Sequence, residues 1–166
     1  MKKLIYGKTW VGKSVNFIGP ILRESNKVLY ITENGIANEL SVMGVDNDFM
    51  LSFSKEYVTG DTYKTYIDLF RVPVLERDDV LMGDIVREIE SSGVSNDPDA
   101  TVIFSGFANA MNDTDFIARI TGWSASVIVE FTAFRVDDME NGLELKDIYA
   151  SDAWEKVIVR EPIGER

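Results

Sequence analysis

Cysteine and histidine are both absent from this chain of 166 residues. Without cysteine there can be no disulfide and no thiolate nucleophile, and without either residue there is no structural zinc site of the usual kind. The absence of histidine also excludes a Ser-His-Asp triad and an imidazole general base. Any proton transfer must therefore use Asp, Glu, Lys, Tyr or water. Any metal must be a hard cation on oxygen ligands, with Mg²⁺ as the first candidate.

Long apolar runs and basic runs are also lacking. No segment approaches the roughly 20 apolar residues of a membrane span, and Leu4–Tyr6 is too short for the apolar region of a signal peptide. We therefore expect a cytoplasmic protein without a membrane partner. The net charge is −11 and the 17 Lys and Arg residues are scattered, so a polyanion would be repelled and nucleic acid is not an expected partner. Solubility explains the acidity without a special ligand.

Short apolar segments alternate with helical patterns along the chain. The segments that read as strands are Lys3–Tyr6, Lys27–Thr32, Thr101–Phe104, Ala125–Phe131 and Lys156–Val159. Apolar residues at helical spacing predict helices over 13–25, 82–89, 116–123 and, more weakly, 137–149. Strands that alternate with helices form parallel sheets covered on both faces. We therefore expect one α/β domain over residues 1–166, with three layers and a mainly parallel sheet flanked by helices.

Some details of this pattern are irregular. Pro20 removes a hydrogen bond from the first expected helix, which predicts a kink or an early end at Gly19-Pro20. Either Asn112 or Asp113 can cap the helix over 116–123. Residues 36–79 have no clear period, and within them 48–58 fits a helix or a strand.

One motif carries specific chemistry. Residues 7–14 (GKTWVGKS) match G-x-x-x-x-G-K-[ST] in full, after an expected strand and at the start of an expected helix. Gly7 and Gly12 let the backbone curl so that successive N–H groups point at phosphate oxygens, and the helix N-terminus adds its dipole. Lys13 would reach the β- and γ-phosphates as the catalytic residue, and the Ser14 hydroxyl would bind Mg²⁺. The predicted site for ATP and Mg²⁺ consists of Gly7, Lys8, Thr9, Trp10, Val11, Gly12, Lys13 and Ser14. With this motif, the expected three-layer α/β domain is P-loop NTPase-like.

The loop resembles that of a known family. Residues 9–14 fit the T-x-V-G-K-[ST] form found in dethiobiotin synthetase and in the related P-loop domain at the N-terminus of some phosphate acetyltransferases. In the C-terminal third, a strand at 126–131, an acidic helix start at Asp137-Asp138 and the segment 146–149 follow that family's order. The resemblance implies ATP and Mg²⁺ as cofactors, an ATP-dependent ligase-like reaction and a homodimer.

The chain departs from the family pattern at two positions. The family places a Lys-Pro, whose lysine contacts substrate, just after its second strand, and this chain has Thr32–Gly35 there. In the family, an acidic residue that helps to hold Mg²⁺ directly precedes a glycine. In this chain Ser105 precedes Gly106, so a serine stands where the family has the acid. The resemblance therefore supports nucleotide binding but not the family's carboxylation and ring-closing chemistry.

Several side chains allow two interpretations. Glu33, after the second strand, could replace the missing acid near the metal or could be a turn residue. Glu130 lies either near the ligand or paired inside the domain. Lys8 occupies the position of the signature lysine of partitioning-type ATPases, or it is a solvated loop lysine. Trp10 could stack on a base, meet a partner chain or cover the core.

The sequence leaves more than one function open. The leading hypothesis is an ATP-binding protein of the dethiobiotin-synthetase-like group, either a weak Mg²⁺-dependent ATPase or an ATP-dependent ligase whose second substrate is not known. The first alternative is a nucleotide-sensing or interaction module without turnover. The second is a small recombinase-like or packaging ATPase, although the acidic composition argues against it.

Overall fold

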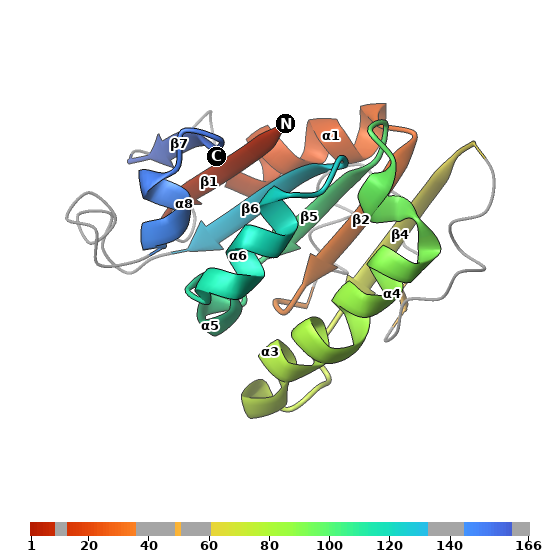
Figure 1. Cartoon of the computed structure of the whole chain (residues 1–166), viewed down its shortest axis with the longest axis horizontal. Helices are drawn as coiled ribbons and strands as arrows, with labels where there is room; N and C mark the ends of the chain where they lie inside the picture. The colour runs from red at the N-terminus through yellow and green to blue at the C-terminus, as the bar shows by residue number, and fades with distance from the viewer. Residues whose placement is uncertain (9–12, 36–48, 51–60, 133–144, 161–166) are drawn as a thin grey trace.

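A parallel sheet forms the centre of the computed structural model, which describes residues 1–8, 13–35, 49–50, 61–132 and 145–160. Within these residues the sheet has seven strands in the order β3-β4-β2-β5-β6-β1-β7, and every pair is parallel (Figure 1). The strands are β1 (Lys2–Gly7), β2 (Lys27–Thr32), β3 (Phe49–Met50), β4 (Tyr63–Asp68), β5 (Thr101–Ser105), β6 (Ser126–Thr132) and β7 (Glu155–Val159). The expected α/β class is therefore confirmed.

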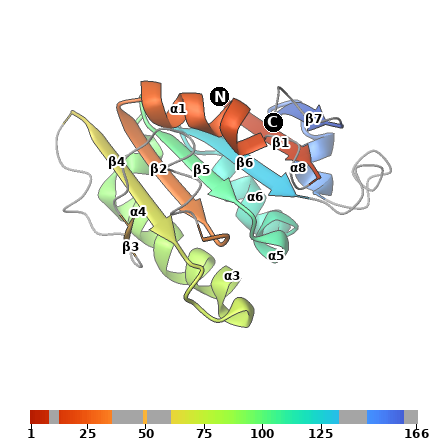
Figure 2. The same ribbon diagram turned by 180° about the vertical axis from the view of Figure 1, so that it is seen from behind.

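Helices cover both faces of this sheet. One face packs against a π-helical turn (Ser14–Ile18) and the helix α1 (Gly19–Glu24) that continues it, as Figure 2 shows. The opposite face carries the other helices of the described residues (Figure 1). These are α3 (Arg77–Val80), a π-helical turn (Leu81–Ile85), α4 (Val86–Ser92), α5 (Ala108–Met111), α6 (Thr114–Thr121) and α8 (Lys146–Ala150), with short 3₁₀ turns at Val74–Glu76 and Val94–Asn96. The domain therefore has the three layers that the sequence predicts.

The first helix does not end at Gly19-Pro20. Pro20 lies in the first turn of α1, which runs on to Glu24. Because α1 directly continues the π-helical turn, Pro20 lies inside a helical segment, where it removes one backbone hydrogen bond and its ring crowds the preceding turn. The irregularity expected at Pro20 instead takes the form of the wider π-helical turn just before α1.

The sequence analysis missed one long strand, β4. Four of its six residues are buried, and the strand lies between β3 and β2. Helices or loops cover both faces of such a strand, so its sequence shows no alternation of apolar and polar residues. Within the ambiguous stretch 48–58, the described residues Phe49 and Met50 form a strand. Of the weak helix expected over 137–149, only residues from 145 onward are described, and α8 covers Lys146–Ala150.

Asp113 is the residue that caps α6. Its Oδ1 accepts a hydrogen bond from the backbone N–H of Phe116 at 2.9 Å. Asn112, the other candidate, has a different role, because its Oδ1 accepts the N–H of Leu145 at 2.8 Å and so ties the start of α8 to the end of α5.

Removing this cap tests the assignment. We expect Asp113→Ala to lower the free energy of unfolding by about 1 kcal/mol, because an N–H in the first turn loses its acceptor. Asp115→Ala removes the same charge from the same turn without removing a cap, so its cost is limited to the helix-dipole contribution of roughly 0.3 kcal/mol. Urea denaturation of both variants measures the difference, and equal losses would contradict the capping role.

Candidate functional site

A row of polar side chains crosses the carboxyl edge of the sheet. Asp68, Thr32, Ser105 and Glu130 are in register on β4, β2, β5 and β6, and Glu130 is in turn in register with Ile5 on β1. In-register residues of a parallel sheet point to the same face, and Ile5 packs in the cluster that contains Ile18 and Leu22. The polar row therefore faces the layer of α1. Parallel α/β sheets bind their ligands at this edge.

Lys13 is buried at the end of β1. Its side chain is 5% exposed, and its Nζ donates hydrogen bonds to the carbonyl oxygens of Gly7 at 3.0 Å and Lys8 at 2.5 Å. Burial lowers the pKa of Lys13, and the negative charge of Glu130 opposes that shift. The motif lysine thus lies against the residues that begin the loop, with a carboxylate nearby.

The rest of the predicted phosphate loop is described only in part. Gly7 is the last residue of β1 and is buried, whereas Lys8 is exposed. Thr9, Trp10, Val11 and Gly12 lie outside the described residues, and Ser14 is placed only as the first residue of the π-helical turn. The roles predicted for these residues stay predictions, including the Mg²⁺-binding hydroxyl of Ser14.

Glu130 lies between Ser105 and the loop. It is 5% exposed, and the Ser105 hydroxyl donates to its Oε2 at 3.4 Å. Its strand, β6, is the neighbour of β1 in the sheet. The structure therefore gives Glu130 a partner inside the domain, and a place near a ligand stays a prediction.

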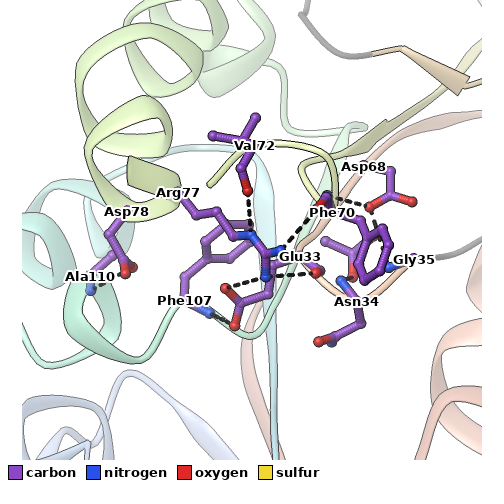
Figure 3. Close-up of polar contacts among 11 residues, drawn as sticks. Glu33, Asn34, Gly35, Asp68, Phe70, Val72, Arg77, Asp78, Phe107 and Ala110 are labelled. Carbon is purple, nitrogen blue, oxygen red and sulfur yellow. Dashed lines mark hydrogen bonds and ion pairs between the residues drawn. The ribbon is translucent and has the colours of Figure 1, made fainter. Parts of the chain in front are cut away.

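Glu33 belongs to a separate cluster at the same edge (Figure 3). Its Oε1 accepts the backbone N–H of Phe107 at 3.1 Å, and its Oε2 lies 3.9 Å from Nη1 of Arg77. The Arg77 guanidinium also donates to the carbonyl oxygens of Glu33, Phe70 and Val72. One carboxylate oxygen thus has a backbone donor and the other has a cation nearby, which is the environment of a residue that holds a turn. Metal binding by Glu33 stays a prediction.

The turn that Glu33 holds is strained. Gly106 and the buried Phe107 have φ values of +96° and +62°. A non-glycine residue in this left-handed region costs of order 1–3 kcal/mol and often marks a functional segment. A Cβ at Gly106 would lie 2.5 Å from Glu33 Oε1 and 2.7 Å from Glu33 Cγ. The glycine is therefore required both by the backbone and by the close approach of Glu33.

The position of the family's substrate lysine has a different environment here. Thr32 is fully buried, and its hydroxyl accepts the N–H of Asn34 at 3.2 Å. The carboxylate of Asp68 accepts the N–H groups of Phe70 at 2.9 Å and Gly35 at 3.4 Å. These contacts shape the turns after β2 and β4, so Thr32 offers no exposed group to a substrate.

Sequence reasoning missed Arg77 and the pairing of Ser105 with Glu130. The contact between Arg77 and Glu33 spans 44 residues and that between Ser105 and Glu130 spans 25. No local pattern signals either contact. The available clue was that Ser105 and Glu130 each lie near the end of a predicted strand.

Comparison with protein-family models, with curated proteins and with solved structures finds no match. The resemblance of the loop to dethiobiotin synthetase is therefore supported by its residues alone. Among the described residues, no three acidic side chains gather as a metal-binding group. No described helix has the length and apolar character needed to cross a bilayer.

Substitution of Gly106 tests the strained turn. We expect Gly106→Ala to lower the free energy of unfolding by about 2 kcal/mol, because alanine is disfavoured at this φ and its Cβ displaces Glu33. Gly83→Ala is the matched control, since Gly83 lies in a helical turn and a Cβ there would have no neighbour within 4 Å. It should be neutral or stabilising by up to about 1 kcal/mol. Denaturant titration compares the two, and a neutral Gly106→Ala would refute the constraint.

Proposed function

We propose that this chain is a P-loop nucleotide-binding protein that takes the phosphates of a nucleoside triphosphate, together with Mg²⁺, at Gly7–Ser14. The proposal combines a motif in the sequence with its surroundings in the fold. The motif follows β1, which ends at Gly7, and precedes the helical segment that begins with Ser14. This strand–loop–helix context is the one in which the motif forms a phosphate-binding loop.

The environment of Lys13 is the observation that carries the proposal. A buried ammonium needs hydrogen-bond acceptors, and the acceptors seen here are the carbonyl oxygens of Gly7 and Lys8. A phosphate oxygen is a stronger acceptor for an ammonium than a neutral carbonyl, because the two groups carry opposite charges. We therefore expect Lys13 to exchange these carbonyls for a phosphate at the edge where such sheets bind ligands.

Two activities are compatible with this site. Phosphoryl transfer would depend on positioning and on charge neutralisation by Lys13, the loop N–H groups and Mg²⁺, as in an ATP hydrolase or an ATP-dependent ligase. The neutral Ser105, at the position of the family's acid, favours the alternative of a nucleotide-sensing module without turnover. A homodimer remains a proposal by resemblance.

ATP titration tests the proposed site. We expect saturable binding of ATP with Mg²⁺ by calorimetry, weakened at least tenfold in Lys13→Ala, which corresponds to about 1.4 kcal/mol. Lys64→Ala is the matched control, because Lys64 is an exposed lysine near the amino end of β4, at the opposite edge of the sheet. Equal affinity in wild type and Lys13→Ala would mean that ATP does not use this loop. No binding by the folded wild type would reject the proposal.

Phosphate release separates turnover from sensing. Sustained release that requires Mg²⁺ and disappears in Lys13→Ala would establish an ATPase and exclude the sensing module. Saturable binding without release would support the sensing module. The same assay with DNA tests the hypothesis of a recombinase-like or packaging ATPase. It is done at low salt, where phosphate contacts are strongest, and the hypothesis requires that DNA stimulates phosphate release.

A further inference from the structure

The strand order places one particular carboxylate next to the proposed phosphate loop. β6 is the neighbour of β1, β5 is the second strand away and β2 is the third. Neighbouring strands lie about 4.8 Å apart, so the three strands are roughly 5, 10 and 14 Å from β1. Glu130 on β6 is therefore nearer to the loop than Ser105 on β5 or Glu33 after β2.

The orientation of Glu130 agrees with this position. It shares a register position with Ile5, two residues before Gly7, and points to the face that the π-helical turn and α1 cover. Its charge acts on the Lys13 ammonium. Glu33, in contrast, has Oε1 on the Phe107 N–H and Oε2 near Arg77.

Arrival of a nucleotide would change the charge balance around Glu130. In the present arrangement the positive charge of Lys13 compensates the negative charge of the buried Glu130 carboxylate. A triphosphate brings several negative charges and draws Lys13 to itself, which leaves Glu130 close to an anion where solvent screening is weak. Like charges in such surroundings repel strongly, so a cation beside Glu130 would favour nucleotide binding.

We propose that Glu130, oriented by the Ser105 hydroxyl, is the acidic group that makes nucleotide binding at Gly7–Ser14 depend on a divalent cation. This inference rests on the proposed function. The family that the loop resembles has an acid at the position of Ser105 on β5, and the inference places the corresponding acid of this chain on the adjacent strand, β6. The donor set fits Mg²⁺, which takes hard oxygen ligands and uses one or two carboxylates while substrate phosphates and water supply the rest. Glu130 and Ser105 provide one carboxylate and one hydroxyl.

The test is the factor by which Mg²⁺ tightens ATP binding, obtained by calorimetry as the ratio of Kd in EDTA to Kd in Mg²⁺. We expect this factor to fall about tenfold in Glu130→Gln, within the usual range of coupling between two ligands. Part of the fall should appear as tighter ATP binding in EDTA, because the repulsion is gone. Glu155→Gln is the matched control, since Glu155 is an exposed carboxylate at the amino edge of β7, and it should leave the factor unchanged.

Three results would overturn the inference. An unchanged Mg²⁺ factor in Glu130→Gln, together with unchanged ATP affinity, would show that another group faces the cation. Equal weakening of ATP binding with and without Mg²⁺ would show that Glu130 only positions Lys13. Absence of ATP binding by wild type in both buffers would remove the proposed function as well, and this outcome is distinct from the first two.

A second variant covers the case in which Glu130→Gln does not fold, which circular dichroism would reveal. Ser105→Ala keeps the carboxylate but removes its hydroxyl donor. We expect a Mg²⁺ factor below that of wild type, because loss of a group that orients a metal ligand commonly weakens metal binding. An unchanged factor in Ser105→Ala would then overturn the inference.

Discussion

The burial of opposite charges on Lys13 and Glu130, at one end of a parallel sheet, is the constraint on which the candidate site depends. Each side chain is 5% exposed, and a buried charge is stable only when partners compensate it. The loop carbonyls and Glu130 stabilise the ammonium, and the Ser105 hydroxyl and Lys13 stabilise the carboxylate. Any anion that binds Lys13 must disturb this balance. The charges of Lys13 and Glu130 therefore stabilise each other independently of any ligand.

The turn after β5 links this pair to the rest of the carboxyl edge. Ser105 directly precedes Gly106 and Phe107, whose left-handed conformations are held by the Glu33 carboxylate. Arg77 in turn connects Glu33 to the segment between β4 and α3 (Figure 3). A chain of direct contacts thus runs from α3 through Glu33 to the residues next to Ser105. Backbone strain at such a position persists only because the surrounding contacts fix it.

Local patterns in the sequence were sufficient for the α/β class and limited the cap of α6 to Asn112 or Asp113, because hydrophobic periodicity and capping act within a few residues. They were insufficient for β4, whose burial on both faces removes the alternation that identifies a strand. They also left Glu130 undecided, since its place beside β1 follows from the strand order and not from its neighbours in the chain. The loop is predicted from its motif, but the carboxylate whose charge acts on its lysine could be found only from the fold.

The serine at 105 and the glutamate at 130 are best understood as one feature. The two residues are in register on adjacent strands and point to the same face, so an acid at both positions would place two carboxylates roughly 5 Å apart in a buried setting. Such pairs raise the pKa of one member and neutralise it. A hydroxyl at 105 avoids that repulsion and donates a hydrogen bond to Glu130. The serine on β5 and the glutamate on β6 therefore work as a pair, and the carboxylate of this pair is on the strand next to β1.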